Sequence, residues 1–183
     1  MSKNIPNYTV IKDTREQDGW FFTKYDRCEG MEVVTLHTGD YTLKDYEDII
    51  CIERKASVSE IAINLGKKKQ TFYNEMERMT DFKFRYILLE FSASDIIGYP
   101  ENLLSEEDKQ NYELYKKGEI AKPKGKRFDI VEQTKISGRY LIKALMEISI
   151  RYDINVVFCD NKYNAFLICN SIFKRLNELF NKG

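Results

Sequence analysis

The sequence contains little proline and glycine, a single histidine and no pair of cysteines spaced as C-x-x-C. Three prolines and nine glycines in 183 residues exclude a collagen-like chain and a low-complexity disordered chain. A structural zinc site needs four ligands, usually in two close pairs, and this composition argues against one. The four cysteines are best interpreted as reduced thiols in a reducing compartment, and they are Cys28, Cys51, Cys159 and Cys169.

Charge of neither sign is in excess, because 29 basic side chains balance 29 acidic ones. This balance argues against a protein that coats nucleic acid by bulk electrostatics, although it permits one basic face and one acidic face. Charged residues still make up 32% of the chain, which is above the usual quarter. The composition therefore predicts a highly charged surface or a charged site.

Long hydrophobic runs are also absent. No segment approaches the roughly 18 apolar residues needed to cross a bilayer, and residues 1–8 contain no apolar signal-peptide core. We therefore expect an intracellular protein without membrane attachment. Its length of 183 residues fits one domain.

Hydrophobic periodicity divides most of the chain into strands and helices. The predicted strands are Tyr8–Asp13, Glu32–Leu36, Tyr41–Leu43, Ile49–Arg54, Arg85–Phe91 and Asn155–Cys159. The predicted helices are one that starts at Ser57 and stops at Gly66, followed by Thr71–Thr80, Ser137–Tyr152 and Lys162–Phe180. Strands come first and then alternate with helices, which predicts an α/β fold with a mixed central sheet covered by helices.

Residues 99–136 show no stable period, and basic residues gather in their second half. A structureless stretch of this length inside one domain usually indicates a functional loop or local disorder. We therefore expect a single domain over 1–183 with an irregular, charged insertion at about 99–136.

Charged residues stand where several predicted strands end, namely Asp13, Asp40, Glu53 and Lys55. Residues two apart on a strand point to the same face, so Glu53 and Lys55 should project together while Arg54 points away. Carboxylates that converge from different strands suit Mg²⁺, which prefers oxygen ligands. A neighbouring lysine can orient the attacking water or neutralise charge on a phosphate. The pattern favours metal-assisted hydrolysis of phosphodiester bonds, although so short a motif has low specificity by itself.

Three motifs resemble, in order and separation, those of a known family. Asp13–Glu16 (DTRE), Gly39–Tyr41 (GDY) and Glu53–Lys55 (ERK) resemble the motifs of the XPF/Hef family of structure-specific DNA endonucleases. The resemblance covers nearly the whole chain except about 99–137. It implies a restriction-endonuclease-like fold, an α/β architecture with a mixed central sheet flanked by helices. It also implies a site that uses Mg²⁺ or Mn²⁺ to cut DNA near branch points.

The resemblance also implies a metal site. Asp40 and Glu53 would be the primary metal ligands, the backbone carbonyl of Arg54 could add a ligand, and Asp13 would complete the acidic cluster. The side chain of Arg54 has an alternative interpretation, which is an ion pair on a surface or on the opposite face of the sheet. Tyr41 is interpreted as core packing rather than as a catalytic group.

Further catalytic roles follow from the same resemblance. Lys55 would act on the attacking water or the scissile phosphate, and Arg15 would contact phosphate in the same cleft. Glu16 would support Arg15 or Lys55. Ser59 stands where the family often has an aspartate, and the adjacent Glu60 is a candidate substitute.

Two basic segments are candidates for contact with the DNA backbone. They are Lys67, Lys68 and Lys69 with Arg78, and the segment that contains Lys124, Lys126 and Arg127. The alternative for any such run is a solvated loop. Thr71 stands where the family tends to carry an arginine, so the phosphate-contacting residue is left open. Residues 20–22 (WFF) are interpreted as core or a dimer contact, with base stacking as the alternative.

The helix-hairpin-helix module that holds branched DNA in larger family members has no counterpart in this sequence. Branch specificity is therefore not inherited directly, and whether a heterologous partner supplies the DNA-binding module is left open. Separately, the resemblance implies a homodimer through the C-terminal helices. The leading hypothesis is a metal-dependent DNA endonuclease of recombination, repair or phage-type DNA processing. The alternatives are a non-cutting or partner-dependent DNA-binding module of the same fold, and a nuclease acting on single-stranded DNA or RNA.

Overall fold

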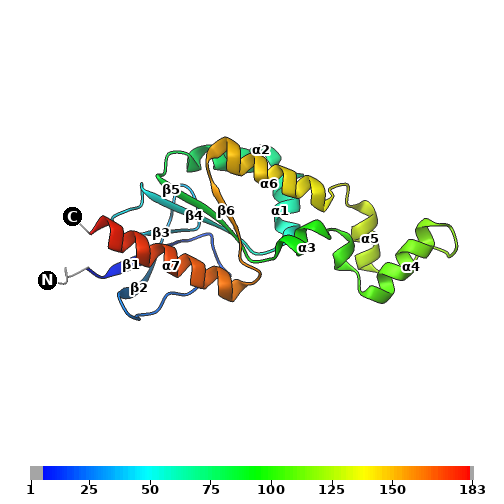
Figure 1. Cartoon of the computed structure of the whole chain (residues 1–183), viewed down its shortest axis with the longest axis horizontal. Helices are drawn as coiled ribbons and strands as arrows, with labels where there is room; N and C mark the ends of the chain where they lie inside the picture. The colour runs from blue at the N-terminus through cyan, green and yellow to red at the C-terminus, as the bar shows by residue number, and fades with distance from the viewer. Residues whose placement is uncertain (1–5, 182–183) are drawn as a thin grey trace.

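The computed structural model describes residues 6–181. They form a mixed sheet in the order β2-β1-β3-β4-β5-β6, with helices on both faces (Figure 1). The strands are β1 (Tyr8–Asp13), β2 (Cys28–Val34), β3 (Tyr41–Leu43), β4 (Ile50–Lys55), β5 (Phe84–Leu89) and β6 (Asn155–Phe158). The helices are α1 (Val58–Leu65), α2 (Lys69–Met79), α3 (Ala93–Ile97), the 3₁₀ turn η1 (Glu101–Leu103), α4 (Glu106–Lys116), α5 (Lys126–Gln133), α6 (Gly138–Tyr152) and α7 (Lys162–Phe180).

This architecture confirms the predicted α/β class. Strand β1 pairs parallel with β2 and antiparallel with β3, whereas β4 pairs antiparallel with β3 and parallel with β5. The second strand was predicted at Glu32–Leu36 but lies at Cys28–Val34. The reason is an irregularity in its pairing with β1, where Gly30 has a φ of 122°. A glycine inside a strand often marks such a bulge, and it interrupts the alternation of side chains on which the prediction depended.

Alternating residues of the central strands belong to two hydrophobic cores. On one face, Cys51 and Ile87 pack with α1, α2 and α6. On the other face, Ile52 and Leu88 pack with α7 and the segment after β1. Every residue of β4 is buried, as its continuous apolar run predicts. The same alternation decides to which face each charged residue at the end of β4 points.

The aromatic segment after β1 belongs mainly to the core. Trp20 and Phe22 are buried, and the Trp20 ring stacks on Tyr41 at a centroid distance of 4.8 Å. Phe21, which lies between them, is 70% exposed. The core interpretation is therefore confirmed for Trp20, Phe22 and Tyr41.

The expectation of an irregular insertion at 99–136 is wrong, because this segment contains η1, α4 and α5. Helix α4 went unrecognised because it has no buried residue and therefore shows no apolar stripe. Helix α5 has only eight residues, of which two are buried, so its period is short. Leu104, Phe128 and Val131 form a small core of their own, against which Tyr112 packs. We call residues 99–136 the arm. Its helices α4 and α5 project from the end of the sheet that lies opposite the two ends of the described chain (Figure 1).

Two further observations concern composition. The four cysteines are all buried and free of disulfide bonds. In residues 6–181, no helix combines the length and the apolar character that a membrane crossing requires.

Candidate active site

Asp40 and Glu53 are brought together by the antiparallel pairing of β3 with β4. The backbone N–H of Asp40 donates to the carbonyl oxygen of Ile52 at 2.9 Å, so Asp40 lies beside the end of β4. Gly39 makes this approach possible at a φ of 78°. A Cβ atom at this position would lie 2.5 Å from the sulfur of Cys51. The GDY turn is therefore a means of placing the aspartate against β4.

Glu53 and Lys55 project together, as the strand period predicts. Lys55 Nζ lies 2.5 Å from Glu53 Oε1 and 3.3 Å from Glu60 Oε1. Glu53 and Lys55 are 3% and 5% exposed, respectively. The second carboxylate oxygen of Glu53, Oε2, is buried and has no hydrogen-bond partner among the described residues. A buried, unpartnered carboxylate oxygen is costly unless a ligand completes it.

The positive charge near Asp40 and Glu53 does not balance the negative charge of the surrounding carboxylates. Burial raises the pKa of Glu53 to about 7; Lys55 opposes this shift and Glu75 adds to it. Burial, reinforced by the charge of Glu53, raises the pKa of Asp40 well above its usual range. Although burial disfavours the ammonium group of Lys55, Glu53 and Glu60 raise its pKa, so it stays protonated. One ammonium group thus faces several carboxyl groups, an arrangement that a divalent cation would balance.

Asp13 does not join this cluster. Its Oδ1 accepts hydrogen bonds from the backbone N–H and the Nε of Arg15, at 2.8 and 2.7 Å. Its Oδ2 accepts from Nη2 of Arg15 at 3.1 Å and from the backbone N–H of Leu36 at 2.6 Å. Burial opposes ionisation of Asp13, but these hydrogen bonds outweigh it and lower the pKa. Asp13 therefore holds Arg15, and its backbone N–H donates to the carbonyl oxygen of Asp40 at 2.8 Å.

The acids that remain fit a single Mg²⁺ or Mn²⁺ ion. Within residues 6–181, no three Asp, Glu, His or Cys side chains are arranged to hold a metal. Mg²⁺ needs only one or two protein carboxylates, since water and substrate phosphate complete its shell. Asp40 and Glu53 provide two, and Oε2 of Glu53 is an oxygen already removed from water. The backbone N–H of Arg54 donates to Oδ2 of Asp40 at 2.7 Å and so orients that carboxylate.

The side chain of Arg54 lies on the opposite face, in a buried ion pair. Its Nε and Nη2 donate to the two carboxylate oxygens of Glu90, each at 2.7 Å, and Nη1 reaches Glu16 at 3.3 Å. The indole N–H of Trp20 donates to Glu90 at 2.7 Å. The structure therefore favours the ion-pair interpretation of Arg54. It also corrects the expected partner of Glu16, which contacts Arg54 because the neighbouring Asp13 already holds Arg15.

The family of this chain follows from a match to a known domain. The ERCC4 domain matches residues 12–171. The chain belongs to the ERCC4-domain family. This assignment confirms the resemblance that the DTRE, GDY and ERK motifs indicated.

Solved structures show that this ERCC4 domain has the fold of XPF. XPF from Aeropyrum pernix superposes with a TM-score of 0.55 at 15% sequence identity, over 90% of this chain and 64% of that chain. XPF from Aeropyrum pernix in complex with DNA gives 0.57 at 14% identity, over 94% and 66%. The chain thus spans about 64% of the length of the XPF chain. Among curated proteins, no sequence matches.

Two acidic residues of this ERCC4 domain were not assigned a role by sequence reasoning. Glu90 follows the apolar run of β5, so it carries the same signal as Glu53, a charge at the end of a buried strand. Glu75 lies on α2 and acts on both Glu53 and Arg15 through its charge. No sequence pattern marks Glu75, because its position depends on how α2 packs against the sheet.

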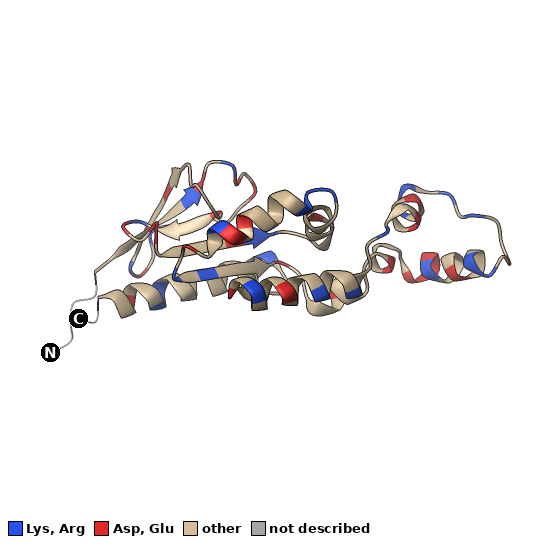
Figure 2. Ribbon diagram, turned by 90° about the horizontal axis from the view of Figure 1, so that it is seen from above, with Lys and Arg blue, Asp and Glu red and all other residues tan. Residues whose placement is uncertain are grey.

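The basic candidates of the ERCC4 domain lie at three different places. Arg15 is largely exposed beside Asp40, and Arg78 donates to Thr38 Oγ1 at 3.2 Å, which ties α2 to the loop before Asp40. The lysines Lys67, Lys68 and Lys69 are exposed; the first two lie between α1 and α2, and Lys69 begins α2. The remaining three, Lys124, Lys126 and Arg127, are exposed on the arm, and Figure 2 shows Lys and Arg along the segment between α4 and α5.

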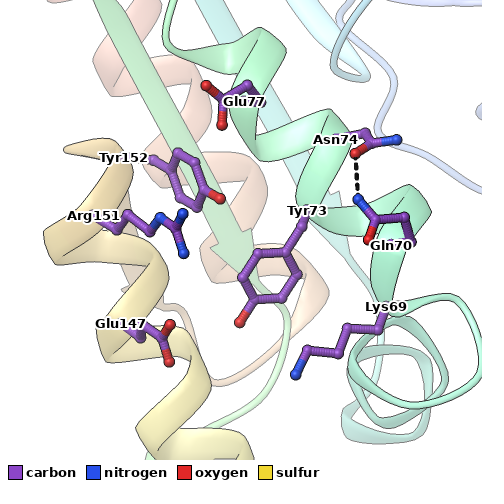
Figure 3. Close-up of a pocket in the computed structure, with 8 residues that line it drawn as sticks. All are labelled: Lys69, Gln70, Tyr73, Asn74, Glu77, Glu147, Arg151 and Tyr152. Atoms are coloured by element: carbon purple, nitrogen blue, oxygen red, sulfur yellow. Dashed lines mark hydrogen bonds between the residues drawn. The ribbon is translucent and has the colours of Figure 1, made fainter.

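A sizeable hollow on the surface is separate from the carboxylates. It measures about 730 Å³ and lies between α2 and α6 (Figure 3). Its walls include Tyr73, Glu77 and Arg151, and Figure 3 shows Tyr73 and Arg151 extending into the space between the two helices. It contains none of the predicted catalytic residues. The candidate active site is therefore defined by charge and burial rather than by cavity size.

The Arg54–Glu90 pair makes a strong prediction about stability. Replacing Glu90 by alanine leaves the buried guanidinium without its main partner, which should cost about 3–5 kcal/mol of unfolding free energy. The matched control is Glu32→Ala, which removes an exposed pair with Lys44 and should cost about 1 kcal/mol or less. Urea unfolding followed by circular dichroism measures both. Equal losses in the two variants would contradict the buried-pair argument.

Proposed function

We propose that this ERCC4 domain is a divalent-metal-dependent DNA endonuclease that hydrolyses phosphodiester bonds in branched or flapped DNA. Such an activity belongs to recombination, repair or phage-type DNA processing. The observation that carries the proposal is the partly buried Asp40 beside the buried Glu53, which has an unpartnered carboxylate oxygen and is in contact with Lys55. Membership of the ERCC4 family and the fold shared with a DNA-bound XPF support it.

Asp40 and Glu53 would hold the metal ion, and the carbonyl of Arg54 is the remaining candidate ligand from β4. When bound, the ion would act as a Lewis acid on the phosphate and lower the pKa of a water molecule. Lys55 is protonated, because Glu53 and Glu60 outweigh the burial that opposes its charge. It therefore cannot act as a general base, and its ammonium group would instead stabilise negative charge that develops on the phosphate.

Two arginines at the rim would position the DNA backbone. Arg15 has a 67% exposed side chain whose Nε is fixed by Asp13 at 2.7 Å. This arrangement leaves other N–H groups of the guanidinium directed to solvent, where a phosphate can accept from them. Arg78 is partly exposed on the neighbouring helix α2. Asp13 would therefore serve catalysis by orienting Arg15 rather than by binding the metal.

Cleavage of labelled DNA tests the proposed activity. With Mg²⁺ or Mn²⁺, the chain should cut at least one of a single strand, a duplex, a splayed fork, a 3′ flap and a four-way junction. Asp40→Asn and Glu53→Gln should each lower the rate by more than about a hundredfold, beyond the range typical of outer-shell changes. Asp81→Asn, which changes an exposed carboxylate on a turn, should cut normally.

The outcomes separate the candidate functions. A chain that binds DNA but cuts nothing with either metal would instead be a binding module or a partner-dependent enzyme. A preference for a single strand of DNA or RNA over every branched substrate would support the single-strand nuclease alternative.

The raised pKa of Glu53 predicts a pH-dependent metal affinity. A carboxyl group must lose its proton to bind a cation, and burial raises the pKa of Glu53 to about 7. The apparent affinity for Mn²⁺ should therefore rise from pH 6 to pH 7 by up to about tenfold and then level off by pH 8. Isothermal titration calorimetry measures this affinity and the protons released. Glu53→Gln should lose both the affinity and its pH dependence, and a flat profile for the unchanged protein would contradict the prediction.

We also propose a homodimer through the C-terminal helices. Strand β6 is an edge of the sheet, and the flanking helices expose Ile150 on α6 and Tyr163 and Leu167 on α7. Exposed apolar side chains next to a free strand edge favour association. Light scattering should show twice the chain mass, and Ile150→Glu should shift the mass toward the monomer. A monomer mass independent of concentration would contradict the dimer.

A further inference from the structure

A groove of about 630 Å³ separates the end of α1 from the arm. Ile63 and Lys67 line the side formed by the body of the protein, and Ile130, Lys135 and Ile136 line the arm side, with Tyr99 between them. Two of its apolar side chains are unusually open to solvent, since Ile63 is 49% exposed and Ile130 is 40% exposed. The groove therefore has apolar walls and two lysines.

The charge of this groove is of one sign. No acidic residue belongs to its lining, which contains two lysines, Lys67 and Lys135. Neither lysine takes part in any of the ion pairs found within residues 6–181. Elsewhere on the arm, Lys122 is held by two acidic residues, Asp129 and Glu132. The groove thus offers positive charge that no neighbouring side chain neutralises.

Helix α1 links this groove to the candidate active site. The helix begins beside Glu53 and Lys55 of the candidate active site, where Ser57 caps it and Glu60 contacts Lys55. It ends at Leu65, next to Lys67. Eight residues at a rise of 1.5 Å give a length of about 12 Å. The groove therefore lies about one helix length from the carboxylates.

The outer wall of the groove is attached at a rigid neck. The backbone N–H of Gly138 donates to the carbonyl oxygen of Tyr99 at 2.8 Å, which joins the two ends of the arm. A Cβ atom on Gly138 would lie 1.9 Å from the carbonyl oxygen of Ile96, so only glycine permits this contact. Beyond the neck, the arm has its own small core. The wall is therefore a folded unit held in place against α1 rather than a disordered loop.

We propose that this groove binds the unpaired strand of a DNA substrate; the inference rests on the proposed nuclease function and names the substrate form that it selects. In an unpaired strand the faces of the bases are free to lie against apolar side chains, and the phosphates can contact Lys67 and Lys135. A duplex keeps its base faces stacked inside and offers phosphates, sugars and the edges of its bases. The groove therefore distinguishes unpaired from paired DNA by its apolar walls.

Binding without divalent metal tests this inference on the full chain, because it does not require cutting. Fluorescence anisotropy in EDTA is measured with a labelled oligothymidylate and with a labelled hairpin duplex. The Lys67→Glu, Lys135→Glu double variant and the single variant Ile130→Asp should each weaken binding of the single strand about tenfold or more. Binding of the duplex, which offers phosphates but no free base faces, should fall less than binding of the single strand in both variants. The matched control is Lys24→Glu, Lys83→Glu, two exposed lysines outside the groove, and it should leave the preference between the two probes unchanged.

The salt dependence gives a second readout. Each lost phosphate contact lowers the slope of log affinity against log salt by about 0.7 for a single strand. The double lysine variant should therefore lower this slope by about 1.4, whereas Ile130→Asp should weaken single-strand binding with little change in slope. Thermal unfolding of each variant confirms that it is folded, and Ile130→Asp provides the test if the double variant is not.

Each outcome distinguishes the groove from the proposed function. Single-strand binding that is unchanged in both groove variants, or that falls equally with duplex binding, overturns the groove. A protein that binds the single strand through the groove but cuts no DNA with Mg²⁺ or Mn²⁺ overturns the nuclease and leaves the groove. A protein that binds neither probe overturns the groove, and one that also cuts no DNA with Mg²⁺ or Mn²⁺ overturns both.

Discussion

The buried ion pair between Arg54 and Glu90 is the interaction on which the site depends. It occupies the face of β4 that packs with Trp20, so the strand period directs Glu53 and Lys55 to the opposite face. The backbone N–H of Arg54 also holds the carboxylate of Asp40 at 2.7 Å. Arg54 thus acts on both proposed metal ligands. Its side chain anchors one face of β4, so that Glu53 points to the other face, and its backbone N–H orients the carboxylate of Asp40. The ERK motif therefore combines a structural residue, Arg54, with two residues of the candidate active site, Glu53 and Lys55.

The carboxylate side of β4 is costly to the folded chain in the absence of a cation. Glu53 and Asp40 both have raised pKa values, mainly because they are buried, and one oxygen of Glu53 has no partner among the described residues. Lys55 compensates only in part. Asp13, by contrast, is fully satisfied by Arg15 and Leu36. Asp13, whose carboxylate has its hydrogen-bond partners, positions an arginine. Asp40 and Glu53, whose charge is not balanced, are the residues proposed to bind metal.

The arm is a helical extension that projects beyond the sheet and the helices that cover it (Figure 1). It leaves the body of the protein after α3 and returns at α6, and its neck is closed by contact of Gly138 with the backbone of Ile96 and Tyr99. Because α1 runs from the catalytic cluster to the groove beneath the arm, the proposed chemistry and the proposed strand-binding surface share one rigid element. Under these two proposals, one domain would combine cutting with recognition of unpaired DNA.

The sequence by itself determined the α/β class, the alternation that places Glu53 with Lys55, and the family, because these depend on local period and on motif order. The helix bounds at Lys162–Phe180 follow from a strong apolar stripe. Only the tertiary structure decided that Asp13 binds Arg15, that Glu90 and Glu16 hold Arg54, and that Glu75 faces the site. The helices of the arm and the bulge at Gly30 could not be predicted from the sequence either, since neither shows a regular period of apolar residues. Partners far apart in the chain meet through packing of whole elements, and no local pattern encodes which carboxylate reaches which arginine.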